Sequence, residues 1–143
     1  MSLSKIVALV TGAGQGLGRA TALRLSHLGA KVMVVDVSEE KAKAVVSEIG
    51  TKSSMYAAID VTDEQGVKKS IQDMTDKWGP LNCAVNCAGI APPMRVINKK
   101  GQPHDLAQFA KVMNVNTVGT FNVVRLAAES MAKVLRLLSL SLN

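Results

Sequence analysis

The segment with the clearest chemical potential is a glycine-rich stretch near the start of the chain, Thr11-Gly12-Ala13-Gly14-Gln15-Gly16-Leu17-Gly18. Its spacing is T-G-x-x-x-G-x-G. Glycines let the backbone approach a phosphate, and a helix that follows directs free N–H groups at the anion. The stretch lies between an apolar run and a helical pattern, which is the context of a diphosphate-binding loop, although a plain glycine-rich turn is the alternative. The candidate cofactor-binding residues here are Gly12, Gln15, Gly16, Leu17 and Gly18.

An acidic residue, Asp36, closes the second apolar run. A carboxylate at this point of a nucleotide-binding βαβ unit accepts hydrogen bonds from the adenosine ribose hydroxyls and repels a 2′-phosphate. The next residues are Val37 and Ser38, so no arginine follows to bind that phosphate, and Gln15 is uncharged. The pattern favours NAD over NADP as the cofactor. The alternative is a solvent-facing acid at a strand end.

The cysteines and histidines do not form a metal-binding pattern. Cys83 and Cys87 have no second ligand pair, and His27 and His104 lie far from them in sequence. We expect no metal, and we expect free thiols that pack internally or line a cofactor site. Free thiols also favour a reducing compartment.

The elements that must position these residues alternate between apolar runs and amphipathic stretches. A box of capping residues at 62–65 opens the third helix, and Pro and Gly residues at 88–104 indicate a long loop. Asp105 caps a long fourth helix, with a bend expected near Asn116. Strands are expected over 6–10, 31–35, 55–59 and 81–86, and helices over 16–28, 38–49, 62–78 and 105–132.

This alternation predicts an α/β fold, a Rossmann-type doubly wound parallel sheet that stops after the fourth strand and the following long helix. Right-handed crossovers give the strand order 3-2-1-4. We expect an incomplete NAD-binding domain at 1–132 and a separate tail at 133–143. In the tail, leucines alternate with serines as in a strand, but Leu135 and Leu138 are spaced as in a helix, which we favour. An open fourth strand predicts marginal stability.

Composition excludes several classes of protein. Of 143 residues, 48% are hydrophobic and 20% charged, and no apolar run approaches the roughly 20 residues of a membrane span. The start of the chain leaves no room for a signal peptide, so we expect none. The net charge of +6 comes mainly from the second half. Its basic residues are scattered and aromatic residues are scarce, so we expect no specific nucleic-acid binding, but attraction of a phosphate-bearing ligand.

The motifs taken together resemble the short-chain dehydrogenase/reductase family over residues 5 to about 132. They are the glycine-rich loop, Asp36, Asp60-Val61, Asn86-Cys87-Ala88-Gly89 and Asn116 in a Val-Asn-Thr setting. The resemblance implies that Asp60 and Val61 contact adenine. It places Asn86, Cys87, Ala88 and Gly89 beneath the nicotinamide ribose, with Cys87 in place of a more usual Asn. It also makes Asn116 the catalytic Asn that seats a relay water.

The family's other catalytic residues have no counterpart in this sequence. Family members use a Ser and a Tyr-x-x-x-Lys pair to move the alcohol proton while hydride passes to the nicotinamide. Tyr56 is the one tyrosine, and Asp60 stands where the Lys would be. We therefore expect a family dehydrogenase whose 143 residues alone give no turnover. The alternative is a catalytically inactive isoform that binds nucleotide or full-length subunits.

Residues 81–131 carry a closer likeness, to family members that act on acyl-CoA. It implies a small-molecule substrate such as a 3-hydroxyacyl-CoA or a hydroxysteroid alcohol, a role in lipid metabolism, and a homo-oligomer at full length. It also implies a mitochondrial location, with the cytoplasm as the alternative. Lys99 and Lys100 lie in the loop before the long helix. We expect them to help bind a CoA phosphate; the alternative is that they belong to a solvated loop with no ligand.

Overall fold

The computed structural model describes the backbone of residues 2–140 and the side-chain environments of residues 2–133. Four parallel strands form one sheet in the order β3-β2-β1-β4, as the sequence predicts. The elements are β1 (Val7–Thr11), α1 (Gly16–His27), β2 (Lys31–Asp36), α2 (Glu39–Ile49), β3 (Ser54–Ala58), α3 (Glu64–Trp78), β4 (Cys83–Asn86), α4 (Leu106–Met113), the π-helical segment η1 (Asn114–Gly119) and α5 (Thr120–Leu140).

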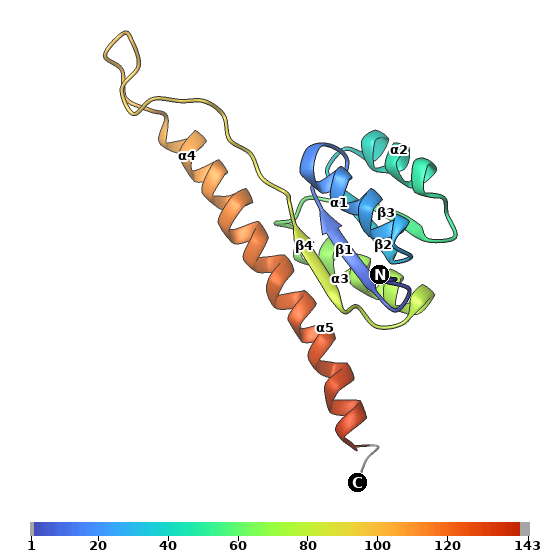
Figure 1. The fold of residues 1–143 in the computed structure, drawn as a ribbon. Helices are drawn as coiled ribbons and strands as arrows, with labels where there is room; N and C mark the ends of the chain where they lie inside the picture. The colour runs from blue at the N-terminus through green and yellow to red at the C-terminus, as the bar shows by residue number, and fades with distance from the viewer. Residues whose placement is uncertain (1, 141–143) are drawn as a thin grey trace.

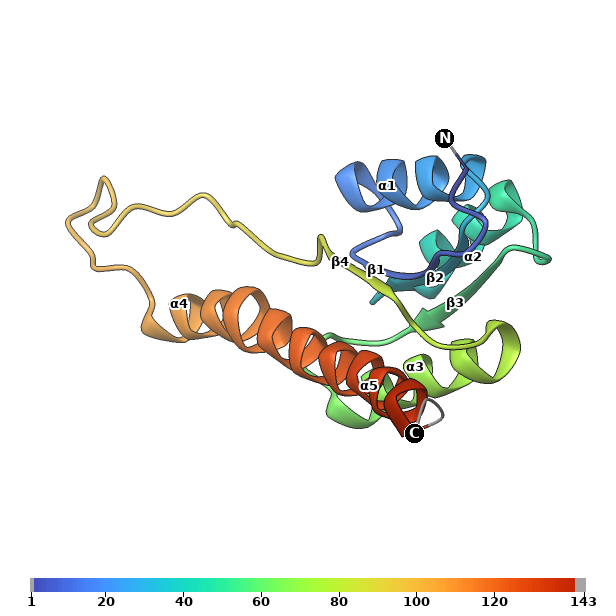
Figure 2. The ribbon, with the colours of Figure 1, turned by 60° about the horizontal axis from the view of Figure 1, so that its bottom comes forward.

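Helices cover both faces of this sheet (Figure 1). Alternate strand residues point to opposite faces, so a strand covered on both sides is apolar throughout. Val10, Val32 and Val34 pack on α1 and α2, whereas Leu9 and Met33 pack on α3 and α5. Figure 2 shows α1 above the sheet and α3 and α5 below it. The layered core places the carboxyl ends of all four strands along one edge.

The fourth strand, Cys83–Asn86, is shorter than the predicted 81–86, and the Asn82 side chain just before it bonds to the start of β1. Its Nδ2 donates to the Lys5 carbonyl at 2.9 Å, and its Oδ1 accepts from the Val7 amide at 2.9 Å. These bonds tie the start of β4 to the start of β1. On its other side β4 pairs with no strand of the described chain.

The predicted capping box at the third helix is wrong by one position. Asp63, rather than Thr62, is the N-cap, and its carboxylate accepts from the Gln65 amide at 3.0 Å. Thr62 instead donates through its amide and hydroxyl to Asp60 Oδ1, at 2.9 and 2.8 Å. Aspartate is as strong an N-cap as threonine, so the competing local turn decides the outcome.

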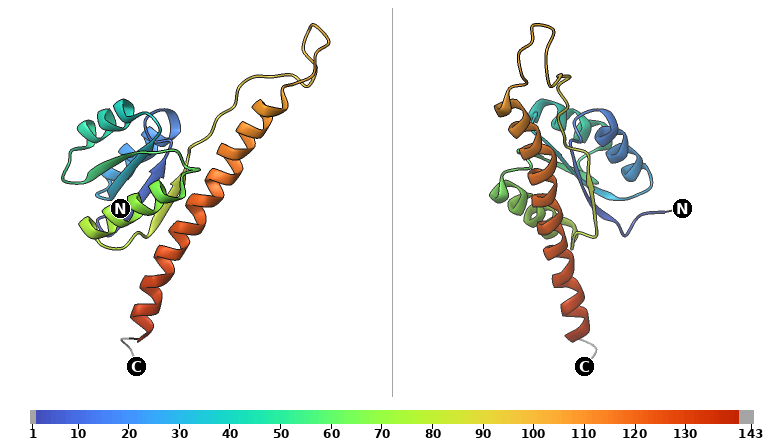
Figure 3. Two further views of the ribbon diagram at one scale, coloured as in Figure 1. Left: turned by 180° about the vertical axis from the view of Figure 1, so that it is seen from behind. Right: turned by 90° about the vertical axis from the view of Figure 1, so that its left-hand side faces the viewer.

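The long fourth helix is divided rather than merely bent. Asp105 caps α4 as expected, with its carboxylate accepting from the Ala107 amide at 2.9 Å. A π-helical segment contains Asn116, where the sequence predicts a bend, and α5 follows without a break. Figure 3 shows this rod extending past the sheet and the loop of residues 88–105 reaching away from it. The tail continues α5 to Leu140, and its last three residues lie outside the described part.

The described helices include none that is both long and apolar enough to cross a membrane.

Candidate functional site

A cavity of about 660 Å³ lies at the carboxyl ends of the strands, where the glycine-rich loop, β2 and β4 converge. Ligands of open α/β sheets bind at this end, where the strand order reverses. Every cofactor-binding residue predicted from the sequence lines it, apart from Asn86. The lining residues among them are Gly12, Gln15, Gly16, Leu17, Gly18, Asp36, Asp60, Val61, Cys87, Ala88 and Gly89.

Two glycines of the loop allow it to pack against β4 and α1. A Cβ added to Gly12 would lie 2.7 Å from the Ala88 nitrogen, and φ at Gly12 is +61°, which side chains rarely adopt. A Cβ on Gly18 would collide with the Gly12 carbonyl. The loop therefore turns tightly and delivers the first turn of α1 to the cavity.

The amino end of α1 offers an anion site. Gln15 is its N-cap but gives no side-chain hydrogen bond to the helix, and the first turn holds no acidic residue. A Cβ placed on Gly16 would meet nothing within 4 Å. The first amides of a helix lack partners inside the helix and carry partial positive charge. The geometry thus fits a diphosphate group.

The Asp36 carboxylate is fixed by two backbone amides. Gly14 donates to its Oδ2 at 2.8 Å and Ser38 donates to its Oδ1 at 3.0 Å. A Cβ on Gly14 would fall 2.8 Å from that Oδ2, so glycine is needed for this contact. A carboxylate accepts up to about four hydrogen bonds, so each oxygen keeps capacity for a ribose hydroxyl.

Thr11 organises the opposite wall. Its hydroxyl oxygen accepts from the amides of Cys87 and Ala88, at 3.2 Å each. Thr11 ends β1 and Cys87 follows β4, so the residue joins the glycine-rich loop to the motif of residues 86–89. Asn86 is not among the lining residues, and its buried Oδ1 has no hydrogen-bond partner within the described chain.

The Asn116 side chain stabilises a backbone segment that lines the cavity. Its Nδ2 donates to the Ile90 carbonyl at 2.9 Å, and its Oδ1 accepts from the Ile90 amide at 2.8 Å. The side chain is not in the cavity lining, whereas its neighbours Val115 and Ile90 are. The π-helical segment thus fastens the chain that leaves β4. A catalytic role for Asn116 stays a prediction.

Sequence reasoning missed several residues of the site. Thr11 and Gly14 belong to the glycine-rich motif, but their hydrogen-bond partners follow β4 and end β2. Nearby sequence therefore could not predict these contacts. Lys111 and Val115 line the cavity from α4 and η1, four residues apart on one helical face. That spacing was a usable signal. The remaining missed lining residues are Val35, Val37, Ile59 and Ile90.

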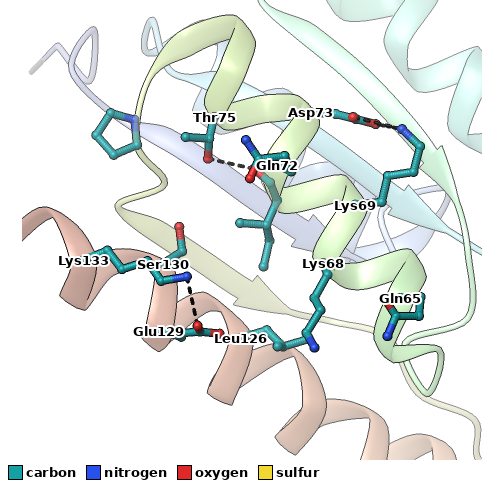
Figure 4. Close-up of a pocket in the computed structure, with 12 residues that line it drawn as sticks. Gln65, Lys68, Lys69, Gln72, Asp73, Thr75, Leu126, Glu129, Ser130 and Lys133 are labelled. Atoms are coloured by element: carbon teal, nitrogen blue, oxygen red, sulfur yellow. Dashed lines mark hydrogen bonds and ion pairs between the residues drawn. The ribbon is translucent and has the colours of Figure 1, made fainter.

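A second hollow, of about 910 Å³, lies between α3 and α5 (Figure 4). Its lysines are occupied by carboxylates. Lys69 pairs with Asp73 at 2.7 Å, and Lys133 pairs with Glu129 at 2.9 Å. With these charges paired, the hollow has less to offer an anion than the cavity at the strand ends. Within residues 2–140, no group of His, Cys, Asp or Glu side chains is arranged to hold a metal ion.

Comparison with known proteins agrees with this geometry. The family model described as short chain dehydrogenase matches residues 6–135. The chain therefore belongs to the short-chain dehydrogenase family, a family of oxidoreductases. Members of that family to which the chain is similar include 3-hydroxyacyl-CoA dehydrogenase type-2 enzymes.

The relative from Drosophila melanogaster is 45% identical over 130 residues, which is 90% of this chain and 51% of the relative. The relative from Homo sapiens is 41% identical over 133 residues, covering 92% of this chain and 51% of the relative. The crystal structure of the type-2 enzyme from Mycobacterium avium aligns with a TM-score of 0.81 at 34% identity, over 89% of this chain and 49% of that one. The chain spans about half the length of these relatives.

Proposed function

We propose that this chain is the NAD-binding part of a dehydrogenase that oxidises a secondary alcohol such as a 3-hydroxyacyl-CoA. The observation that carries the proposal is the Asp36 carboxylate, held by two amides beside the amino end of α1. NAD, when bound, supplies the hydride acceptor for alcohol oxidation. The residues of this chain hold and orient it, with the α1 amides on the diphosphate and Asp36 on the adenosine ribose.

The test is a calorimetric titration of the purified chain with NAD and NADP, beside thermal unfolding, for wild type and Asp36→Asn. We expect NAD to bind more tightly than NADP. The variant should lose about tenfold or more in NAD affinity, since a hydrogen bond to a charged group contributes about 1.5–3 kcal/mol. The ratio of its affinities for NAD and NADP should also be smaller than in wild type. Unchanged affinities in the variant would remove the assignment of Asp36.

We propose further that the 143-residue chain binds cofactor without turnover. Tyr56 donates its hydroxyl to Glu39 at 3.2 Å, and Lys43 lies 5.6 Å from its ring centroid. Neither Tyr56 nor Lys43 lines the cavity, so this pair does not serve the site. Measurable NAD reduction by the purified chain, with a 3-hydroxyacyl-CoA present, would contradict this.

The acyl-CoA substrate class finds support in the loop that precedes α4. Asn98 Oδ1 accepts from the amides of Lys100 and Gln102, at 2.8 and 3.1 Å, which shapes a tight exposed tip at Lys99 and Lys100. Two cations there suit a CoA phosphate, against the alternative of a merely solvated loop. Replacing both by Gln should weaken coenzyme A binding several-fold. Equal binding by both forms would favour the solvated loop.

Homo-oligomer formation and a mitochondrial location are also proposals, carried by likeness to the family members with acyl-CoA substrates. The exposed apolar side chains of α4 and α5, among them Phe109 and Phe121, suit subunit contact. They equally suit the second candidate function, a noncatalytic chain that binds full-length subunits. Fractionation of cells that express the full coding sequence tests the location, and the cytoplasm is the alternative result.

A further inference from the structure

Lys41 lies beside the ribose-binding carboxylate although it is five positions further along the chain. It belongs to the first turns of α2, and its amide donates to the Ser38 hydroxyl at 3.4 Å. A Cβ built on Gly14 would fall 2.8 Å from Asp36 Oδ2 and also 2.8 Å from Lys41 Cβ. Gly14 therefore packs between the lysine stem and the carboxylate.

Lys41 is not itself among the residues that line the cavity, but its ammonium group bonds to one that is. Its Nζ donates to Gln15 Oε1 at 2.6 Å, and Gln15 lines the cavity together with Asp36. The ion pairs of the described residues give Lys41 no carboxylate partner within 4.0 Å. Its charge is thus bonded to a neutral amide, which leaves it available to an anion that enters at this end.

We propose that Lys41 is a specificity-determining residue of the cofactor cavity, whose ammonium group partly offsets the repulsion of Asp36 for a phosphorylated adenosine ribose. The proposal rests on the proposed function, because it assigns the adenosine end of the ligand to Asp36. The chain then prefers NAD but discriminates against NADP less sharply than the carboxylate alone would.

Coulomb's law gives the scale that such an effect can reach. A cation about 6 Å from a dianionic phosphate contributes a factor of about ten in affinity at the dielectric constant of water. It contributes much less to NAD, which carries no phosphate on that ribose. Salt screens exposed charges at this range, so the factor should shrink at high ionic strength.

A neighbouring lysine supplies a matched control. Lys43 is on the same helix, and its ammonium pairs with Glu39 at 2.9 Å. Lys43→Gln therefore removes the same charge two residues away, without touching Gln15 or the cavity lining.

The test measures affinities of wild type, Lys41→Gln, Lys41→Arg and Lys43→Gln for NAD, NADP, 5′-ADP and 2′,5′-ADP by calorimetry at low ionic strength. We expect Lys41→Gln to weaken NADP and 2′,5′-ADP about five- to tenfold and to leave NAD and 5′-ADP within twofold. Lys41→Arg should keep the wild-type ratio, and Lys43→Gln should change none of the four.

Three results would overturn the proposal. Equal weakening of NAD and NADP by Lys41→Gln would show that Lys41 only props up Gln15. Equal effects of Lys41→Gln and Lys43→Gln would show a general charge effect. No affinity of wild type for 2′,5′-ADP at millimolar concentration would show that Lys41 offsets nothing. Failure of NAD itself to bind wild type is a different outcome, because it removes the proposed function as well.

Discussion

The two thiols of the chain lie four residues apart, yet the structure gives them different surroundings. Cys83 is in β4, and burial raises the pKa of its thiol above the ordinary value. Cys87 follows the strand and lines the cavity. The thiolate is the reactive form, so a raised pKa slows alkylation at neutral pH, and the rate rises only as the pH approaches that pKa.

We therefore predict that iodoacetamide at pH 7.5 labels Cys87 faster than Cys83, and that NAD protects Cys87 alone. Peptide mass spectrometry over a time course measures both rates. A Cys83→Ala variant serves as the control that assigns the faster phase. Labelling of Cys87 that is unaffected by saturating NAD would place the dinucleotide away from β4.

Among single residues, Asp36 and the glycines could be predicted from the sequence as candidate binding residues, because their chemistry is local to one turn. The dependence of the site on Thr11 could not be predicted, since a threonine at a strand end is common. Its meaning comes from the amides of Cys87 and Ala88, more than 70 positions away. The sequence shows that Gln15 is uncharged, but it does not show that Lys41 places a positive charge beside Gln15.

The π-helical segment packs directly behind one wall of the cavity. Gly119 packs so closely that a Cβ there would lie 2.5 Å from Val61 Cγ2, and Val61 lines the cavity. Nearby, the buried Asn122 donates to the Val61 carbonyl at 2.8 Å. The segment therefore sets the wall that the family resemblance assigns to adenine.

We predict that Gly119→Ala lowers the free energy of unfolding by about 1–3 kcal/mol, because overpacking outweighs the gain of about 1 kcal/mol in helix propensity. NAD affinity should fall as well. Urea unfolding measures the first effect and calorimetry the second. The double variant Gly119→Ala, Val61→Ala restores space and should recover part of the loss. A Gly119→Ala variant that is more stable than wild type would contradict the close packing of Gly119 against Val61.

An ion pair joins α3 to α5. Glu64 accepts from Lys68 at 2.5 Å and from Arg125 at 2.9 Å, and these bonds lower the pKa of the Glu64 carboxyl below its ordinary value. A lowered pKa gives a contribution that is present above the ordinary value and lost as the pH falls through the lowered one. Because the pair is exposed, its contribution is small.

We predict that Glu64→Gln is slightly less stable than wild type at pH 7, and that the difference disappears as the pH falls below the lowered pKa of the Glu64 carboxyl. Denaturant unfolding at several pH values checks this, with Glu40→Gln as the control for removal of one negative charge. A difference that persists undiminished at low pH would show that the glutamate acts through packing.

The order and type of the elements could be predicted because buried strands and amphipathic helices differ in hydrophobic period. Their ends could not. Thr62 and Asp63 are both good caps, and the choice depended on the Asp60 carboxylate. The π-helical turn was foreseen only as a bend, since the bond of Asn116 to Ile90 spans 26 positions.

For the whole molecule, the open side of β4 and the long rod of α4 and α5 are the dominant features (Figure 3). Phe109 is 53% exposed and Phe121 is 65% exposed. Large exposed apolar patches mark contact surfaces or aggregation sites. The isolated chain should therefore associate as its concentration rises.

We predict that Phe121→Glu shifts the chain toward the monomer in sedimentation velocity across a concentration series. Val96→Glu is the matched control, because Val96 is 80% exposed but lies in the loop rather than on the rod. Identical behaviour of both variants and wild type would show that the rod is not a contact surface.

In our proposal the glycine-rich loop and Asp36 hold a dinucleotide at the carboxyl ends of the strands. The most direct measurement is a titration of the ¹⁵N-labelled chain with NAD, followed by amide chemical shifts. We expect the largest changes at Gly12–Gly18, Asp36 and Cys87–Gly89, and small ones at the hollow between α3 and α5. Largest changes at Lys68, Lys69 and Glu129, or none at millimolar NAD, would contradict it.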